Sequence, residues 1–500
     1  MDVAEQLKDD LRSGRLKPDR LVDLLVDLQR QLHAANQRIA ELEKRLGGSS
    51  AKVEKPYSLR AEEKRQNARG KKQRKQRSGR RGRLSTADKI ANAEREVDVL
   101  PDGLTKNACQ LSHTRPVWRL ENGRAVLVAY HIYRGPHDRY GKIPGVLGRS
   151  EFSLEIMLAI AHLVYVVGLS FDKVGLVFHF FQNLKLTKSQ TDALLHRLAR
   201  HWKNEFEILC TLLANSAVVH ADETSWSLNS VWAFLSEKAR LIFYGVHKDA
   251  DTLKEILDPA TFAGLVISDD AAVYANFTKA QKCWAHLLRK AIKLTLEEPN
   301  NPNHAEYRRF ADRLLEIYRA ACRVHQDGRL GDAGRARKVG ELDDEILELC
   351  GPMWAADLPP LEGRPDNDYR LLANELMRLM LARELFSFVT TPPVQQPNGE
   401  SRPVGGTNNE SERTLRGPAQ ARDTGRTNKT LAGARRQTIL TSVLQSLRVY
   451  LPTFTLASVI AEVQRWLKQG RSCFAKQLKK LKLQLPDHSV LDRVLPQPSG

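Results

Sequence analysis

The feature that most restricts the fold of this chain is a change in its hydrophobic pattern near residue 202. Before that point the apolar residues recur at helical spacing, whereas residues 217–221, 231–235 and 241–246 are short apolar runs separated by turn-like breaks. Three such runs in succession predict an antiparallel meander. The pattern then predicts a helix over 251–257, an apolar strand over 263–267, a further helix and strand, and a helix from Ala285.

This order of strands and helices predicts an α/β ribonuclease-H-like core. In such a core the first and fourth strands are neighbours, so Asp222 and Asp269, which follow those strands, are expected to converge at one edge of the sheet. Carboxylates on rigid strands are the ligands that hard divalent cations require. A third carboxylate would complete a two-metal site for phosphoryl transfer. A candidate lies in residues 407–413, which include Glu410 and Glu412, but periodicity alone does not select it, because a glutamate on a basic helix is more often part of an ion pair.

Charge is concentrated in two blocks. The formal net charge is +19, of which residues 51–84 and 401–500 each carry +11, while residues 1–50 are neutral and residues 85–400 carry −3. Nine of the fifteen residues from 69 to 83 are basic and none is acidic or apolar, so this segment cannot bury a core. We expect a disordered arm that binds DNA phosphates rather than a solvated linker. Its basic residues are Arg69, Lys71, Lys72, Arg74, Lys75, Arg77, Arg80, Arg81 and Arg83.

The N-terminal residues carry a heptad pattern of apolar side chains from Leu21 to Leu46, which ends at Gly47-Gly48. It predicts a coiled coil that dimerises, with packing against the same chain as the alternative. Six cysteines without a C-x-x-C pair, and no signal-like apolar run, favour a cytoplasmic protein. Residues 156–171 are apolar but are interrupted by His162 and too short to span a membrane, so we expect a buried helix and no membrane contact.

These patterns divide the chain into eight segments. They are a coiled coil (1–48), a basic arm (49–84), an irregular and partly β region (85–150), a helical region (151–205), the first part of the core (206–295), a helical insertion (296–400), the completion of the core with basic helices (401–470) and a C-terminal tail (471–500).

Several helices are expected within these segments. They cover residues 152–167, 170–181 and 187–202, then 305–324 and 369–385, and finally two amphipathic helices over 430–450 and 455–468. The pair over 170–202 is either an ordinary helical pair or a helix-turn-helix that inserts Lys188, Gln190 and Thr191 into a major groove.

Four short motifs then carry a more specific resemblance. They are His220-Ala221-Asp222-Glu223-Thr224, Ser268-Asp269, Cys283-Trp284-Ala285-His286 with Arg289-Lys290, and Asn408-Asn409 with Glu412-Arg413 and Arg416. Over about residues 150–470 the chain resembles the DDE transposases of the insertion-sequence-66 family. The resemblance implies that Asp222, Asp269 and Glu412 are the catalytic, metal-binding triad, loaded with two Mg²⁺ or Mn²⁺ ions. It also implies a helical insertion between the second aspartate and the glutamate.

The alternatives at the site involve neighbouring residues. Asp270 stands where the family usually has glycine and competes with Asp269, and Glu410 competes with Glu412. Glu223 is expected to point away from Asp222, because adjacent strand residues face opposite sides. Cys283 and His286 form a C-x-x-H pair, for which packing is favoured over zinc binding because no second pair is evident. Many relatives carry a cysteine-rich zinc module before the core, whereas this chain has only Cys109 there, so we expect no structural zinc.

The resemblance implies a transposase of a bacterial insertion sequence that cuts DNA at the element ends and transfers the strand to target DNA. Double-stranded DNA is then the partner, together with a second copy of the chain and companion proteins of the element, at the nucleoid in the cytoplasm. Basic residues expected to contact DNA near the triad are His286, Arg289, Arg413, Arg416, Arg422 and Arg426, with Lys429, Arg435 and Arg436 in the same cluster. The alternatives are a catalytically inactive or domesticated DNA-binding regulator, and a simple nuclease of the same fold.

Overall fold

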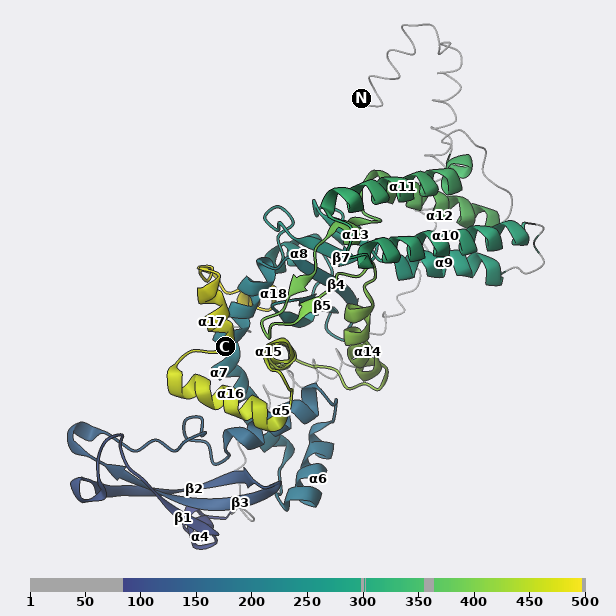
Figure 1. Cartoon of the computed structure of the whole chain (residues 1–500). Helices are drawn as coiled ribbons and strands as arrows, with labels where there is room; N and C mark the ends of the chain where they lie inside the picture. The colour runs from purple at the N-terminus through teal and green to yellow at the C-terminus, as the bar shows by residue number, and fades with distance from the viewer. Residues whose placement is uncertain (1–83, 298–300, 302, 355–363, 497–500) are drawn as a thin grey trace, which may run out of the picture. The chain divides into compact units, whose positions relative to one another are not determined.

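The computed structural model describes residues 84–297, 301, 303–354 and 364–496 (Figure 1). The predicted coiled coil and the basic arm up to Arg83 therefore lie outside the described residues. The described part is a mixed α/β structure. Its strands are β1 (Arg95–Val99), β2 (Gln110–Glu121), β3 (Arg124–Arg134), β4 (Val218–Ser225), β5 (Ser230–Ser236), β6 (Arg240–Val246), β7 (Leu265–Ser268), β8 (Ala280–Lys282), β9 (Val394–Gln395) and β10 (Ser401–Arg402).

The α-helices lie before, between and after these strands. They are α4 (Thr86–Ala91), α5 (Leu154–Tyr165), α6 (Phe171–Gln182), α7 (Lys188–Ala214), α8 (Ala250–Ile256), α9 (Trp284–Glu297), α10 (His304–Gln326), α11 (Asp332–Cys350), α12 (Arg364–Leu381), α13 (Ser387–Thr390), α14 (Asn409–Asp423), α15 (Leu431–Tyr450), α16 (Leu456–Gln469), α17 (Cys473–Lys480) and α18 (Val490–Val494). None of the helices in the described ranges is long and apolar enough to cross a membrane.

The central sheet has five strands in the order β6-β5-β4-β7-β8. β4, β5 and β6 form the antiparallel meander that the sequence predicts. β7 pairs with β4 in parallel, with His220 opposite Ile267, so the first and fourth strands of the core are neighbours as expected. The predicted helix between the last two strands is wrong, because only a short 3₁₀ turn at Ala272–Tyr274 precedes β8.

The two faces of the sheet are covered by different helices. On one face Trp232 and Phe234 of β5 belong to the same buried cluster as Phe206 of α7. On the other face Val231 and Ala233 of β5 are in a smaller buried cluster with α14 and α15. Successive residues of a strand point to opposite faces, so the completely buried β5 is apolar throughout its centre.

The outer edge of the sheet is closed by α15 rather than by another strand. The backbone N–H groups of Arg240, Ile242 and Tyr244 in β6 donate to the hydroxyls of Ser446, Ser442 and Thr438 at 2.9, 2.9 and 3.0 Å. The three hydroxyl residues are four positions apart and so share one helix face. This satisfies an edge that would otherwise be exposed. The helix is thus buried around most of its circumference, and the predicted amphipathic character of 430–450 is wrong.

Residues 85–150 are more regular than the sequence analysis expected. β2 and β3 form a long antiparallel hairpin, and β1 pairs with β3 in parallel. The hairpin turns at Asn122-Gly123, where both residues have positive φ (52° and 78°), as a tight turn of the type I′ class requires. The expectation of an irregular region therefore missed a local turn signal.

The helical pair α6–α7 begins as predicted but does not present one of the expected side chains. Ser170 and Thr187 cap the two helices, and Gln190 folds back onto Thr187. Thr191 is completely buried, and Lys188 is paired with Asp172 at 2.6 Å. The predicted insertion of Thr191 into a major groove is wrong for this conformation, because its side chain is in the core. For Lys188 and Gln190 the helix-turn-helix alternative remains a prediction.

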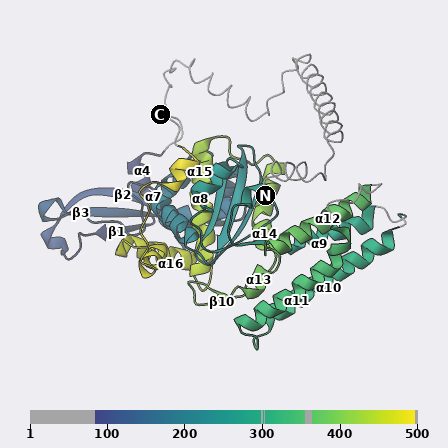
Figure 2. The same ribbon diagram turned by 90° about the horizontal axis from the view of Figure 1, so that it is seen from above.

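The predicted insertion, residues 296–400, contains α10, α11 and α12, which lie side by side with α9 (Figure 2). α10 matches the helix predicted over 305–324 and α12 overlaps the one predicted over 369–385, whereas α11 was missed. The ring of Trp284, at the start of α9, stacks on that of Tyr318, and its indole N–H donates to the carbonyl of Leu385 at 2.7 Å. The end of the insertion is thus fixed next to the beginning of α9, from where the chain returns to the sheet.

The segment called a C-terminal tail contains folded structure. In α18, Leu491 is buried in the main core and Asp492 pairs with Lys203 of α7 at 2.7 Å. The eight segment boundaries as such remain predictions.

Candidate active site

The three carboxylates of the predicted triad come from three separate elements. Asp222 lies in the second half of β4, Asp269 directly follows β7, and Glu412 is in the first turn of α14. The pKa of Asp222 is raised to about 7, first by burial and next by the charge of Glu223, with further contributions from Asp269 and Glu412. The charges of Asp269 and Glu412 therefore reach Asp222, although among the described residues these three carboxylates do not form a group whose ligand atoms all lie within 4.8 Å of one another.

Asn408 attaches α14 to the sheet and so positions Glu412. Its buried side-chain amide donates to the carbonyl of Ala221 in β4 at 2.7 Å, and its backbone N–H donates to Sγ of Cys283 at 3.1 Å. The hydroxyl of Ser411 donates back to the Asn408 carbonyl at 2.9 Å. Asn408 therefore links β4 and the start of α9 to α14, the helix that carries Glu412.

The two glutamates of this motif face different surroundings. Glu410 is bound by the guanidinium groups of Arg240 and Arg402. Oε1 of Glu412 instead lies 2.8 Å from Arg289 and 3.6 Å from Nδ1 of His286, both on α9. Of these two glutamates, Glu412 and not Glu410 is among the charges that raise the pKa of Asp222.

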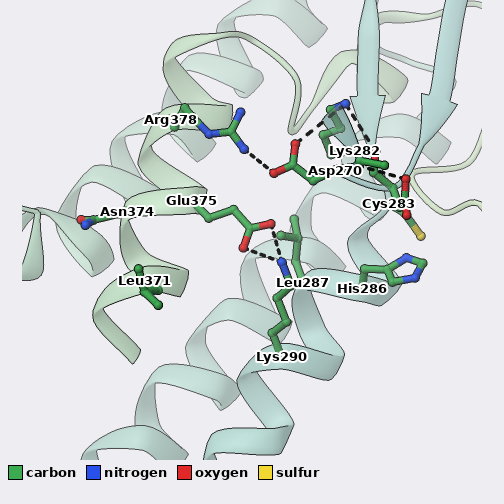
Figure 3. Close-up of a pocket in the computed structure, with 12 residues that line it drawn as sticks. Asp270, Lys282, Cys283, His286, Leu287, Lys290, Leu371, Asn374, Glu375 and Arg378 are labelled. Atoms are coloured by element: carbon green, nitrogen blue, oxygen red, sulfur yellow. Dashed lines mark hydrogen bonds and ion pairs between the residues drawn. The ribbon is translucent and has the colours of Figure 1, made fainter. Parts of the chain in front are cut away.

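The two aspartates that follow β7 also differ in their contacts. Asp270 is bound by Arg378 of α12 and lies 3.9 Å from Lys282, as Figure 3 shows. The carboxylate of Asp269 accepts a hydrogen bond from the backbone of Ala271 at 3.1 Å and is the one that acts on Asp222. Asp270 is thus held by the insertion, whereas Asp269 has no ion pair within the described residues.

Glu223 is a part of the site that sequence reasoning underestimated. Its side chain is 2% exposed, pairs with Lys248 at 2.7 Å and accepts a hydrogen bond from the hydroxyl of Tyr274. The pKa of Lys248 is raised, first by its own hydrogen bond to Glu223. Burial opposes this effect, and the charges of Glu223, Asp269 and Asp222 add to it. The strand register correctly separates Glu223 from Asp222, but its charge still reaches the aspartate. No local signal identifies Lys248 or Tyr274.

Cys283, His286 and Glu412 form a second potential ligand group, with one ligand atom of each within 4.8 Å of the others. Burial raises the pKa of the Cys283 thiol, which disfavours the thiolate that a soft metal needs. Burial, and next the charge of Arg289, lower the pKa of His286, so its imidazole is neutral near pH 7. The structure adds a third residue to the C-x-x-H pair but no fourth among the described residues.

A cavity of about 650 Å³ opens beside this edge of the sheet (Figure 3). Asp269, Cys283 and His286 line it on one side, and residues of α12 line it on the other. Lys290 crosses between the two helices to Glu375 at 2.7 Å. The cavity thus lies between the sheet edge and the helical insertion, with both acidic and basic groups on its walls.

The basic residues after Glu412 fall into two groups. Arg413, Arg416 and Arg426 are exposed, and Arg422 donates to the carbonyl of Ser225 at the end of β4 at 3.2 Å. All four remain predictions as DNA contacts.

Arg435 and Arg436 are different, because both are 8% exposed. Arg435 is paired with Asp492, and Arg436 is paired with Asp192 and donates to the hydroxyl of Tyr165 at 2.8 Å. The prediction that they belong to the DNA-binding cluster is wrong, because both guanidinium groups are buried and form ion pairs between α15 and neighbouring helices.

The fold and the site define an α/β protein with an acidic centre at a sheet edge. Residues 149–358 match the model of the transposase IS66 family, a family of DNA-processing enzymes. This match confirms the resemblance over residues 149–358, which contain three of the four motifs, whereas the fourth, at residues 408–416, lies beyond it. The matched region contains Asp222 and Asp269 and ends before Glu412. No curated protein matches the chain.

Proposed function

We propose that this protein is a DNA transposase whose carboxylate cluster, Asp222, Asp269 and Glu412, catalyses divalent-metal-dependent cleavage and strand transfer. The proposal rests on the neighbouring positions of β4, β7 and α14, together with the raised pKa of Asp222, which is caused first by burial and next by the charge of Glu223, with smaller contributions from Asp269 and Glu412. A protein gains no stability from gathering like charges at one point. Such a cluster is instead typical of a functional site.

The topology supports a ribonuclease-H-like core. Three antiparallel strands are followed by two parallel ones, and β4 lies in the middle of the order β6-β5-β4-β7-β8. This order puts the end of β4 beside the end of β7. Two ligands are thereby held on a rigid support, which a precisely spaced metal site needs.

The donor set fits hard divalent cations such as Mg²⁺ or Mn²⁺. Asp222, Asp269 and Glu412 would hold them, since carboxylate oxygens are the preferred ligands and a cation would offset both the burial and the neighbouring negative charges that raise the pKa of Asp222. Two such ions, when bound, would activate the attacking oxygen and stabilise the leaving oxygen of an in-line phosphoryl transfer.

Side chains of the protein prepare the site for a phosphodiester. Arg289 neutralises Glu412, and Lys248 neutralises Glu223, so basic groups stand on the rim of the acidic centre. Guanidinium and ammonium groups in this position bind the scissile backbone and orient it toward the carboxylates. The substrate is double-stranded DNA, both element ends and target, and the place of action is the nucleoid in the cytoplasm.

The test is cleavage of duplex DNA that carries the terminal repeats of the element. Asp222→Ala, Asp269→Ala and Glu412→Ala should each lower cleavage in Mg²⁺ by about 10³-fold or more, because a metal ligand contributes several kcal/mol to the transition state. DNA binding in EDTA should remain. The matched controls are Asp270→Asn and Glu410→Gln, which change the neighbouring carboxylates and should retain most of the activity.

Two outcomes would contradict the proposal. Unchanged cleavage by Asp222→Ala would exclude the triad. Tight DNA binding by the unaltered protein without any cleavage in Mg²⁺ or Mn²⁺ would favour a DNA-binding regulator that has lost catalysis.

A further inference from the structure

A second basic site lies on α7 and the loop that precedes α5, outside the carboxylate centre. It is an open pocket of about 340 Å³ lined by Leu147, Gly148, Arg149, Arg197, Arg200 and His201. The three α7 residues are spaced i, i+3 and i+4 and so project from one face of the helix. We call this group, with Arg149, the α7 basic pocket.

The arginines of the α7 basic pocket have no counter-charges. Within the described ranges Arg149, Arg197 and Arg200 form neither an ion pair nor a hydrogen bond, although most arginines around the carboxylate centre are paired. Glu151, close in sequence, is taken by Lys89 at 2.7 Å. Gathering unpaired like charges is unfavourable unless an anion neutralises them.

Together with burial, these charges lower the pKa values of the neighbouring residues Arg115 and His201. Burial, followed by the charges of Arg149 and Arg197, lowers the pKa of Arg115. Burial, followed by Arg200 and Arg197, lowers the pKa of His201. The charges of these basic groups therefore act on one another across the pocket.

The loop that supplies Arg149 is held in a defined shape. Arg119 of β2 donates to the carbonyl of Pro144 at 2.6 Å, and Arg115 donates to the carbonyls of Gly148 and Ser150 at 3.3 and 3.2 Å. Gly148 has a φ of 59°, a conformation that favours glycine. Two arginines of β2 thus hold the loop backbone around Arg149 through hydrogen bonds, so the position of this residue in the pocket is fixed by the fold.

We propose that the α7 basic pocket binds the sugar–phosphate backbone of duplex DNA. The guanidinium fork matches phosphate oxygens, and the heads of Arg149 and Arg200 are exposed, as contact with a long polyanion requires. The lining has no Phe, Tyr or Trp side chain, its one ring being the imidazole of His201, and we expect its arginines to position DNA through phosphates without specifying sequence. This inference rests on the proposed function and adds to it a contact away from the catalytic carboxylates.

The experiment measures binding of labelled duplex DNA by fluorescence anisotropy at several salt concentrations in EDTA, so that no metal or catalytic step is involved. The double variant Arg197→Ala/Arg200→Ala should bind at least tenfold more weakly. The slope of log affinity against log salt should fall by about 2, since two phosphate contacts and their released counterions are lost. The control is Arg308→Ala/Arg309→Ala on α10, which removes the same charge from two exposed arginines without partners in the described structure.

The outcomes are distinguishable. An unchanged slope, or an equal loss in the α10 control, would overturn the α7 basic pocket while leaving the transposase proposal intact. Stronger protection against heat by inorganic phosphate than by duplex DNA at equal ionic strength would assign the pocket to a free anion and also overturn it. No DNA binding by the unaltered chain would contradict the proposed function itself. Circular dichroism checks that each variant is folded.

Discussion

Replacing Asp222 by asparagine should stabilise the metal-free protein at alkaline pH, although it removes a central residue of the site. The pKa of Asp222 is raised from an ordinary 3.8 to about 7, so the folded state holds this proton more tightly than the unfolded state does. Stability from the protonated group is complete below about pH 4 and is lost as the pH rises through about 7. Asparagine remains neutral, and its Oδ1 can still accept the backbone hydrogen bond from Glu223, which is 2.9 Å long.

The size of the effect follows from the two pKa values. Each pH unit between 3.8 and about 7 corresponds to about 1.4 kcal/mol, which gives an upper bound of about 4 kcal/mol at high pH. Partial access of water to the carboxylate and relaxation around it reduce this bound, so we expect about 1–3 kcal/mol. In a protein of this size that is a rise in Tm of about 1–3 °C.

The assay is thermal unfolding in EDTA at about pH 4 and about pH 9, with Asp312→Asn as the control. Asp312 is an exposed carboxylate on α10. The stabilisation by Asp222→Asn should be present at the high pH and almost absent at the low pH, while the control changes little at either. Addition of Mg²⁺ at high pH should then raise the Tm of the unaltered protein more than that of Asp222→Asn, because a ligand that binds the folded state stabilises it. Equal Tm values for variant and parent at about pH 9 would refute the argument that Asp222 is repelled by its neighbours.

Two further substitutions test Arg289, which pairs with Glu412, and Asn408, which links α14 to the sheet. Arg289→Ala should tighten Mg²⁺ binding, measured as a larger Tm shift at low Mg²⁺, because Arg289 competes with the cation for Glu412. It should also weaken DNA binding in EDTA, and a loss of both affinities would contradict this competition. Asn408→Ala should destabilise the protein by about 2–4 kcal/mol in urea unfolding, since it leaves the buried carbonyl of Ala221 without its donor. Glu412→Ala should cost much less stability, and an equal cost would show that α14 is not fastened through Asn408.

The order of the central sheet could be predicted because apolar runs of strand length, separated by turns, leave few arrangements. The same argument failed where the decisive signal was a two-residue turn. Asn122-Gly123 between alternating apolar residues specifies the hairpin of β2 and β3, and attention to that pair would have found it. α15 could not be predicted as a buried helix, because its hydroxyl residues are polar in sequence and become buried only by accepting hydrogen bonds from β6.

The triad candidates were found through motifs, whereas the groups around them were not. Lys248 and Tyr274 contact Glu223 from segments that are separate in sequence, and no local pattern reports such pairings. Arg435 and Arg436 show the reverse error. They follow several exposed arginines in the sequence and resemble them, but both lie on the buried side of α15.

The acidic side chains at the sheet edge differ in whether they form an ion pair with a basic residue. Glu412, Glu223 and Asp270 each have a basic partner, and those partners come from α9, from the segment between β6 and α8, and from α12. Asp222 and Asp269 have no ion pair within the described residues, and both are placed by strands of the central sheet, Asp222 in β4 and Asp269 directly after β7. Under the proposed function, cations occupying the centre would release the basic partner of Glu412 at the rim, where a phosphodiester arrives. Metal and DNA then reinforce each other's binding, which predicts a greater affinity for DNA in Ca²⁺, a cation that binds carboxylates.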